Sequence, residues 1–393
     1  MSELTYLEKL LDGVKVEWQT LGKVLKRTKG TKITAGQMKA LHKDNAPLKI
    51  FAGGKTVAFV DFKDIPEKDI NREPSIIVKS RGIIEFEYYD KPFSHKNEMW
   101  SYHSNNDAIS IKYIYYFLKI NEGYFQKIGG KMQMPQIATP DTDKFEVPIP
   151  CPDNPEKSLA IQSEIVRILD KFTELTAELT AELTAELSMR KKQYNYYRDQ
   201  LLSFKEDEVE GKRKTLGEIM KMRAGQHISA HNIIERKEES YIYPCFGGNG
   251  IRGYVKEKSH DGEHLLIGRQ GALCGNVQRM KGQFYATEHA VVVSVMPGIN
   301  IDWAFHMLTA MNLNQYASKS AQPGLAVGKL QELKLFVPSI ERQIYIAAIL
   351  DKFDTLTNSI TEGLPREIEL RQKQYEYYRD LLFSFPKPET VSN

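Results

Sequence analysis

The 393-residue sequence contains no uninterrupted apolar run of the roughly 18 to 20 residues that span a bilayer. Its opening residues, MSELTYLEKLLDG, are acidic and amphipathic, so they lack the basic and then apolar pattern of a secretory signal. Cysteine is scarce as well. Cys151, Cys245 and Cys274 form an odd, scattered set that cannot build a disulfide framework. These absences argue against a membrane-spanning or secreted protein, and we expect a cytoplasmic one.

The sequence also lacks the short motifs of DNA-modifying enzymes. It has no Pro-Pro-Tyr or Pro-Pro-Phe signature of the amino-methyltransferase kind, no glycine-rich cofactor loop after a first strand and no ATPase motif. Two His-x3-His pairs, His227 with His231 and His260 with His264, have no Cys-x-x-Cys nearby, so scattered surface histidines are expected instead of a zinc site. We therefore expect a chain that is not an enzyme and holds neither metal nor cofactor.

Two stretches of the sequence occur twice at one spacing. ILDKF at Ile168–Phe172 returns at Ile349–Phe353, and KQYNYYRDQLLSF at Lys192–Phe204 returns as KQYEYYRDLLFSF at Lys373–Phe385, each 181 positions later. A repeated unit of this length, a domain plus a helix, indicates an internal pseudo-two-fold. Such a protein presents two similar heads to a nearly two-fold target, of which duplex DNA is the commonest.

Each copy of the repeat follows a segment of mixed α/β character. Strand-like runs lie at residues 55–62, 75–89, 264–277 and 289–295, and helical patterns lie at residues 111–120 and 302–311. Each segment closes on prolines, at residues 147–155 and 336–339, where a helix cannot continue. The sequence therefore predicts two globular α/β domains, at residues 1–150 and 205–340, each followed by a helical segment, at residues 151–204 and 341–393.

The helical segments carry long apolar stripes. A heptad seam in the first copy is formed by Ile161, Ile165, Ile168, Phe172 and Leu175. TAEL then occurs three times over Thr176–Leu187, and because four residues overshoot a helical turn by about 40°, this stripe drifts around the helix. The second copy has EGLPRE instead, whose Gly363 and Pro365 should interrupt or kink the helix. The stripes are buried only if the helices pair, and antiparallel pairing respects the duplication.

Tyrosines continue the stripe in both copies. Those at helical spacing, predicted to be core residues, are Tyr194, Tyr197, Tyr375 and Tyr378. Tyr196 and Tyr377 fall off the stripe, so we expect them to face a partner.

The chain resembles the specificity subunits of type I restriction-modification systems, most closely the class with TAEL spacer repeats. The resemblance is carried by ILDKF, the tandem TAEL repeats and RKKQYNYYRDQLLSF. In the second domain, FGGNGIRGY (Phe246–Tyr254), IGRQGALCGNV (Ile267–Val277) and TEHAVVV (Thr287–Val293) resemble the target-recognition domains of that family. The first domain has only hints of them, FAGGKT (Phe51–Thr56) and KSRG (Lys79–Gly82).

The resemblance implies a division of labour. Each target-recognition domain would read one half of a split site in double-stranded DNA, while the helices set the distance between the halves and dock two modification (methyltransferase) subunits. Restriction subunits would join that core, and no membrane is involved. The residues expected to bind partner subunits are Phe172, Leu179, Leu183, Leu187, Tyr196 and Tyr377.

Charge and side-chain chemistry indicate where DNA would bind. Lys and Arg outnumber Asp and Glu in both globular domains, by 23 to 19 in residues 1–150 and by 17 to 14 in residues 205–340. In each helical segment the acidic residues are in excess, with 9 Asp and Glu against 7 Lys and Arg. The positive balance therefore lies in the two domains, where a protein that binds a polyanion needs it. Arginine and amide side chains near glycine turns suit base edges, whereas lysines suit phosphates. The predicted DNA-binding residues are Gly53, Gly54, Lys55, Lys79, Arg81, Lys96, Gly247, Gly248, Asn249, Arg252, Arg269, Gln270, Asn276, Lys319 and Gln322.

Two other functions stay open at this point. One is a DNA methyltransferase or nuclease in its own right, which the missing motifs oppose. The other is a coiled-coil scaffold with two protein-binding heads. Neither the half-site sequences nor the spacer length follows from the sequence, because base choice depends on loop geometry.

Overall fold

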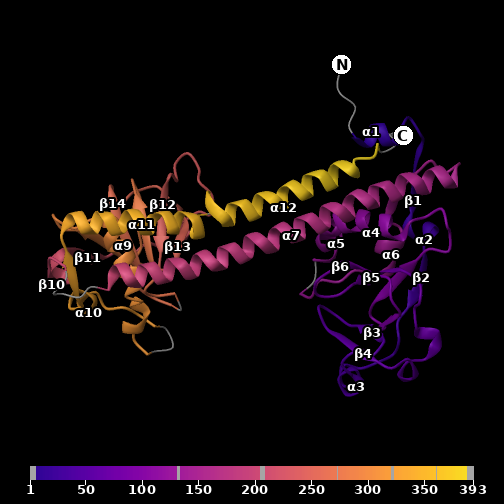
Figure 1. Cartoon of the computed structure of the whole chain (residues 1–393), viewed down its shortest axis with the longest axis horizontal. Coiled ribbons are helices and arrows are strands. Elements are labelled where there is room, and N and C mark those ends of the chain that lie inside the picture. The colour runs from indigo at the N-terminus through magenta and orange to yellow at the C-terminus, as the bar shows by residue number, and fades with distance from the viewer. Residues whose placement is uncertain are drawn as a thin grey trace. The chain divides into compact units, whose positions relative to one another are not determined.

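The computed structural model describes residues 6–130, 133–203, 209–271, 273–319, 323–359 and 361–386. Its internal contacts divide the chain into two compact units (Figure 1). Unit 1 comprises Met1–Thr180 with Leu370–Asn393, and unit 2 comprises Ala181–Glu369. Each unit therefore holds one globular head together with helix segments from both copies of the repeat. Among the described residues, no helix combines the length and apolar character needed to cross a membrane.

Head 1, the globular part of unit 1, contains three small sheets. Its strands are β1 (Val16–Thr20), β2 (Lys26–Lys29), β3 (Leu48–Phe51), β4 (Val57–Val60), β5 (Ser75–Lys79), β6 (Glu85–Tyr89), β7 (Phe93–His95), β8 (Trp100–His103) and β9 (Glu146–Pro150). β1 pairs with β9, one sheet has the order β2-β8-β5-β6, and another has the order β4-β3-β7 with β3 and β7 parallel.

Head 2, the globular part of unit 2, repeats this topology. Its strands are β10 (Gly211–Thr215), β11 (Met220–Ala224), β12 (Tyr243–Gly247), β13 (Gly250–Val255), β14 (Glu263–Gly268), β15 (Val277–Lys281), β16 (Tyr285–Ala286), β17 (Ala290–Val295) and β18 (Lys334–Pro338). β10 pairs with β18, and the other sheets have the orders β11-β17-β14-β15 and β13-β12-β16. Every strand of head 1 thus has its counterpart nine strands later.

Helices flank the sheets of each head and continue beyond them. They are α1 (Tyr6–Leu11), α2 (Leu21–Val24), α3 (Ala35–Leu41), α4 (Ile111–Ile120), α5 (Glu122–Gly129), α6 (Thr139–Asp143), α7 (Pro155–Leu202), α8 (Leu216–Ile219), α9 (Ile301–Ala310), α10 (Val327–Gln331), α11 (Ile340–Asn358) and α12 (Gly363–Leu382). Short 3-10 turns lie at Phe62–Asp64, Glu67–Asp69, Ala230–Asn232 and Leu313–Tyr316. The mixed α/β heads and packed long helices agree with the fold predicted from the sequence.

Equivalent helices in the two heads begin on equivalent polar caps. The Ser110 hydroxyl accepts from the Tyr113 amide at the start of α4, and the Asn300 side chain accepts from the Trp303 amide at the start of α9. Behind the caps, α4 buries Tyr113 in the core of head 1 and α9 buries Trp303 in the core of head 2. Each cap therefore fixes where the buried face of its helix begins.

Two buried glutamines, 181 positions apart, join each head to a long helix. Gln162 on α7 accepts a hydrogen bond from the Ser110 amide at 2.9 Å and donates to the Ala108 carbonyl at 3.0 Å. Gln343 on α11 accepts from the Asn300 amide at 2.8 Å and donates to the Gly298 carbonyl at 3.2 Å. Both amides are satisfied in the interior, so each one fixes the angle between the helix and its head.

The long helices pack antiparallel within unit 1 (Figure 1). Phe172 on α7 stacks on Tyr378 on α12 with ring centroids 5.7 Å apart, and one residue later the hydroxyls of Thr173 and Tyr375 lie 3.0 Å apart. As the residue number rises on α7 it falls on α12, which confirms the predicted antiparallel pairing in this unit.

The same aromatic stack recurs in unit 2 with its partners exchanged. There Phe353 on α11 stacks on Tyr197 on α7 at 5.5 Å. Phe353 is the counterpart of Phe172 and Tyr197 is the counterpart of Tyr378, each 181 positions away. Each unit therefore joins the phenylalanine of one copy to the tyrosine of the other, the reciprocal arrangement that a pseudo-two-fold requires.

Both stacks should contribute equally to stability. We expect a double-mutant cycle with Phe172→Ala and Tyr378→Ala to give a coupling free energy of about 0.5–1.5 kcal/mol, because stacked rings interact beyond the area they bury. The Phe353→Ala and Tyr197→Ala cycle should give the same value. Urea unfolding of the full chain measures both. Tyr377→Ala is the control, since Tyr377 is 64% exposed, and it should show no coupling to Phe172.

Two details of the helices differ from the sequence-based expectation, and one agrees. α11 ends at Asn358 and α12 begins at Gly363, whose φ is +81°, so the EGLPRE segment interrupts the helix as predicted. Tyr197 and Tyr378, predicted as core residues, are 45% and 39% exposed. Leu169 is fully buried although it lies outside the predicted heptad seam.

Candidate nucleic-acid interface

In head 2, four chain segments meet beside the ends of the central strands. The β12–β13 turn contacts the β14–β15 loop so closely that a Cβ on Gly268 would lie 2.0 Å from the Gly248 carbonyl oxygen. A Cβ on Gly248 would lie 3.1 Å from the Gln270 carbonyl oxygen and 3.2 Å from that of His289. The fourth segment joins through an isolated bridge between Gln270 and Gly324. Glycine is needed here because these backbones approach within contact distance.

Polar side chains from these segments interact with one another. The Asn276 amide donates to Asn249 Oδ1 at 3.3 Å, and His289 Nδ1 lies 2.6 Å from Gln270 Oε1. Arg252 covers Gly247, where a Cβ would lie 2.6 Å from the arginine Cδ. Residues that the sequence predicted from separate motifs are thus brought to one surface of head 2.

Arg269 has a structural role in this surface. Its half-buried guanidinium donates to the carbonyls of Leu325 and Glu288 at 3.3 and 3.5 Å, so it holds two of the converging segments together. Lys319 is exposed at the edge of the same loop, whereas Gln322 lies outside the described residues.

A carboxylate lies directly behind this surface. Glu288 Oε1 is 3.1 Å from His227 Nδ1 and 3.5 Å from His289 Nε2. Burial would raise the pKa of Glu288, but hydrogen bonds from its own backbone amide and from His227 lower it below the usual value. The sequence analysis did not single out His289, although it lies within the quoted TEHAVVV motif.

In head 1 the equivalent segments carry different side chains. Gly53, Gly54 and Lys55 form the β3–β4 turn, where a Cβ on either glycine would meet nothing within 4 Å. Arg81, in the β5–β6 loop, donates from Nε and Nη2 to Gln136 Oε1 at 3.2 and 3.0 Å. Sequence reasoning missed Gln136, because no motif indicates a partner 55 residues further on.

Two lysines predicted to contact DNA are held by acidic neighbours. Lys79 is 7% exposed in its side chain and lies 2.5 Å from Glu85 and 2.8 Å from Glu87 on the neighbouring strand. Burial would lower its pKa, but these two hydrogen bonds outweigh burial and raise it. Lys96 pairs with Glu98 at 2.6 Å. Lys79 therefore stabilises the β5–β6 pair and is not part of the interface that we propose.

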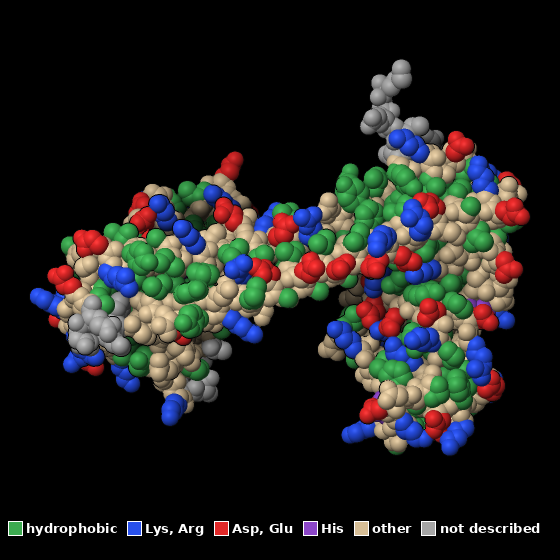
Figure 2. Space-filling view, in the orientation of Figure 1, with side chains coloured by type: hydrophobic (Ala, Val, Ile, Leu, Met, Phe, Trp, Pro, Cys, Tyr) green, Lys and Arg blue, Asp and Glu red, His purple; other side chains and the backbone are tan. Residues whose placement is uncertain are grey.

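The long helix α7 is a poor surface for DNA. Glu178, Glu182 and Glu186 recur with the TAEL repeats, and Figure 2 shows acidic side chains following one another along this helix. A polyanion is repelled by such a row, so the heads are the better surface for it.

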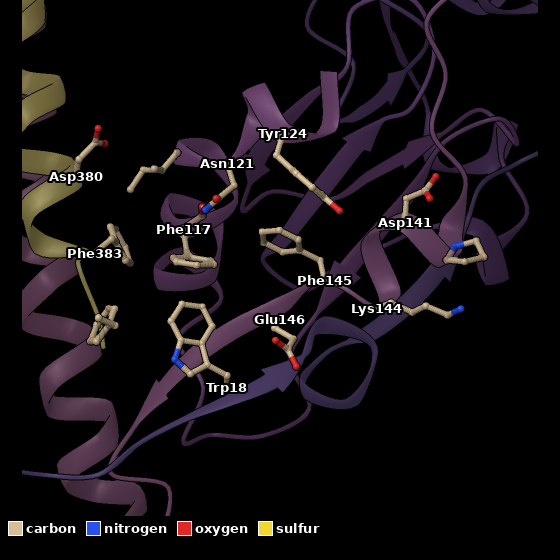
Figure 3. A pocket seen from close by; sticks show the side chains of 13 residues that line it. Trp18, Phe117, Asn121, Tyr124, Asp141, Lys144, Phe145, Glu146, Asp380 and Phe383 are labelled. Atoms are coloured by element: carbon tan, nitrogen blue, oxygen red, sulfur yellow. The ribbon is translucent and has the colours of Figure 1, made fainter. Parts of the chain in front are cut away.

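An aromatic groove of about 800 Å³ lies in unit 1 (Figure 3). Trp18, Phe117, Phe145 and Phe383 line it, and the Trp18 indole donates to the Pro386 carbonyl at 2.9 Å. Its rim carries Asp141, Glu146 and Asp380 against Lys144. The excess of carboxylates makes it unsuited to phosphate.

The tyrosines predicted to face a partner are exposed. Tyr196 and Tyr377 are 61% and 64% exposed, and Leu179 is 41% exposed. Leu183, Leu187 and Phe172 are half-buried, and Phe172 stacks on Tyr378 of the same unit.

The two histidine pairs lie in different surroundings. Among the residues described, no three or more His, Cys, Asp or Glu side chains are grouped to hold a metal ion. His260 and His264 are half-buried and pack against Phe284, with the His260 ring stacked on it at 5.3 Å, so they are not the scattered surface residues that the sequence predicted.

Two heads of one topology, each presenting basic and amide side chains on converging loops, define a two-headed recognition protein. A family model described as "Type I restriction modification DNA specificity domain" matches residues 15–189 and 208–370. The chain belongs to this family. It is a DNA specificity subunit of a type I restriction-modification complex, with two target-recognition domains, and is the non-catalytic component that acts within the methyltransferase complex.

Curated relatives agree along nearly the whole chain. The chain is 67% identical to the type I restriction enzyme EcoprrI specificity subunit of Escherichia coli, over 92% of this chain and 93% of the relative. It is 43% identical to the EcoR124I/EcoR124II specificity subunit of Escherichia coli over 100% of both chains.

Solved structures share the fold at low sequence identity. A type I restriction-modification S subunit from M. genitalium superposes with a TM-score of 0.55 at 17% identity, covering 98% of this chain and 100% of that one. A chain from a study of the assembly and conformational transition of the type I system gives a TM-score of 0.58 at 14% identity, covering 94% and 97%.

Proposed function

We propose that each head reads one half of a bipartite site in double-stranded DNA, through the surface where its four loop segments meet. The observation that carries this proposal is the convergence of four segments in head 2, together with the equivalent bridge between Arg81 and Gln136 in head 1. In both heads they bring arginine and amide side chains to the same place on the same strand framework. Such side chains recognise purine edges in the major groove.

The remaining predicted DNA contacts have supporting roles. Lys55, Lys96 and Lys319 lie on or beside the loops and would contact phosphates, which position a protein without reading sequence. Gly53 and Gly54, where an added Cβ would meet nothing within 4 Å, would let the β3–β4 turn approach the backbone of the duplex closely. Gly247 and Gly248 would instead shape the β12–β13 turn, because an added Cβ there would meet atoms of head 2 itself. Asn249, Arg252, Gln270 and Asn276 would face base edges.

The helices would set the distance between the two half-sites and dock two modification subunits. Tyr196, Tyr377 and Leu179 supply exposed apolar area for that contact. Restriction subunits would join through the modification subunits. Because the DNA of a bacterium lies in the cytoplasm, we place the protein there, and nothing in its proposed task requires a cofactor of its own.

The test uses the chain in complex with its modification subunits. Methylation mapping of a strain with the complete system would give the bipartite motif, and duplexes carrying both halves, either half or neither are then titrated with the complex. We expect duplexes that lack one half to bind roughly 100-fold or more weakly, with an affinity that falls steeply with salt. Equal affinity for all four duplexes would refute the proposal.

A further inference from the structure

Arg81 in head 1 and Gln270 in head 2 occupy the same place in the duplicated fold. Each is the second residue after its strand, β5 or β14, and each forms an isolated antiparallel bridge, Arg81 with Gln136 and Gln270 with Gly324. The glycine that follows is left-handed in both heads, with φ of +77° at Gly82 and +87° at Gly271.

The backbone on either side of this position is held identically. The Gly82 amide donates to the Pro135 carbonyl at 2.9 Å, and the Gly271 amide donates to the Pro323 carbonyl at 3.0 Å. On the other side, Ser80 and Arg269 accept from the amides of Ile137 and Leu325 at 3.0 and 2.9 Å. Both side chains are exposed. The fold therefore presents one variable side chain on a rigid base in each head.

Each of these side chains is oriented by one neighbour. Gln136 Oε1 accepts from Nε and Nη2 of Arg81, which leaves Nη1 and one hydrogen of Nη2 available as a donor fork. His289 Nδ1 faces Gln270 Oε1 at 2.6 Å and so carries the proton that it donates. Gln270 keeps its amide donors and one acceptor lone pair.

The orienting histidine is itself supported. Glu288 lies 3.5 Å from the other ring nitrogen of His289 and also accepts from His227. The contacts from Glu288 to His289 and from His289 to Gln270 fix the plane of the Gln270 amide. In the same way, the two hydrogen bonds from Arg81 to Gln136 fix the plane of the guanidinium. An oriented planar group is what bidentate reading of a base requires.

We propose that this shared position reads a base in each half-site, with Arg81 recognising a guanine and Gln270 an adenine, and that Gln136 and His289 are their positioning residues. The inference rests on the proposed function and names the side chains that carry it. Arginine pairs with guanine O6 and N7, and glutamine pairs with adenine N6 and N7. The neighbouring side chains are engaged elsewhere, since Lys79 is paired with two glutamates and Arg269 with backbone carbonyls.

Reciprocal substitutions test the assignment in the complex with modification subunits, by methylation mapping. Arg81→Gln should change the preferred base at one position of one half-site, from guanine towards adenine. Gln270→Arg should make the opposite change at one position of the other half-site. We expect a shift in discrimination of roughly 10- to 100-fold at the affected base pair. Arg72→Gln and Gln283→Arg make the same changes on exposed side chains away from the loops and should leave both half-sites unchanged.

Arg81→Lys separates base reading from phosphate binding. Lysine keeps the charge but loses the planar fork, so a base reader loses discrimination while a phosphate contact keeps it. Gln136→Met, which removes the acceptor, should weaken preference at the same base pair as Arg81→Lys, roughly 3- to 10-fold, and Gln136→Glu should restore it. A purely structural role for Gln136 would instead change overall methylation and leave base preference intact.

The outcomes separate this inference from the proposed function. If wild-type complex selects no bipartite motif, the proposed function fails. If it does and Arg81→Gln, Arg81→Lys and Gln270→Arg all keep the wild-type motif, the assignment is overturned, as it is if both positions affect one half-site. For variants that bind DNA but do not methylate it, selection of bound duplexes from a randomised pool measures the base preference instead. If the Arg81→Gln chain fails to fold, Arg81→Lys takes its place.

Discussion

Deletion of one TAEL tetrapeptide from α7 should shorten the unread spacer of the DNA site and leave both half-site sequences unchanged. The three repeats lie within one continuous helix of 48 residues, so removing four residues shortens it by about 6 Å and rotates it by about 40°. A base pair of duplex rises about 3.4 Å, so the loss corresponds to one or at most two base pairs. The recognition loops lie in the heads and are untouched.

The expected effect on the parental site is large. On the parental site the shortened protein can engage only one half-site, because the other is out of register. Methylation of the parental site should therefore fall roughly 100-fold or more, and a site with a shorter spacer should become methylated instead. Methylation mapping of cells with the shortened chain and its modification subunits measures both. Glu178→Gln with Glu182→Gln, which keeps the helix length, should retain the parental spacer. Altered half-site sequences after the deletion would contradict the division of labour.

Gln343→Ala should destabilise unit 2 more than any exposed substitution. The change leaves the Asn300 amide and the carbonyls of Gly298 and Pro338 without a partner, and Gln343 is only 1% exposed. Each buried unpaired group costs about 1–3 kcal/mol, so we expect a total loss of about 3–5 kcal/mol. For a unit of this size, that lowers the melting temperature by roughly 6–20 °C.

Calorimetry of the full chain measures the change, and two variants interpret it. Gln343→Glu keeps the volume but turns an acceptor towards the two carbonyls, so it should be as harmful as alanine. Gln315→Ala removes an exposed amide that also bonds a backbone carbonyl, Met311, and should change stability by about 0.5 kcal/mol or less. Equal effects of Gln343→Ala and Gln315→Ala would mean that the buried amide does not join head and helix. Gln162→Ala should repeat the result in unit 1.

Local sequence signals located much of the secondary structure. The run at residues 111–120 coincides with α4, residues 75–89 contain β5 and β6, and the 289–295 run covers β17. These assignments succeeded because the spacing of apolar residues, and the glycines and prolines that end an element, are local features of the sequence. The helix break before Gly363 was predictable for the same reason.

Contacts between residues far apart in the sequence could not be predicted from such local signals. Nothing near Lys79 in sequence reveals that β6 places two glutamates against it, because the strand register decides the contact. Gln136 and His289 likewise reach the loops through bridges between distant segments. The predicted glycine turns and arginines did meet at one surface in head 2, since loops after neighbouring strands share an edge of the sheet.

The exchanged aromatic stacks bear on how the chain originated. Phe172 and Tyr197 belong to one copy and lie 25 residues apart in the same helix, α7, so they cannot stack on each other. In a polypeptide with a single copy, neither the phenylalanine nor the tyrosine would have a stacking partner. In a dimer of two such polypeptides, each phenylalanine could stack on the tyrosine of the other subunit. Tandem duplication of a chain that paired in this way would give the arrangement seen here, with both reciprocal stacks inside one polypeptide.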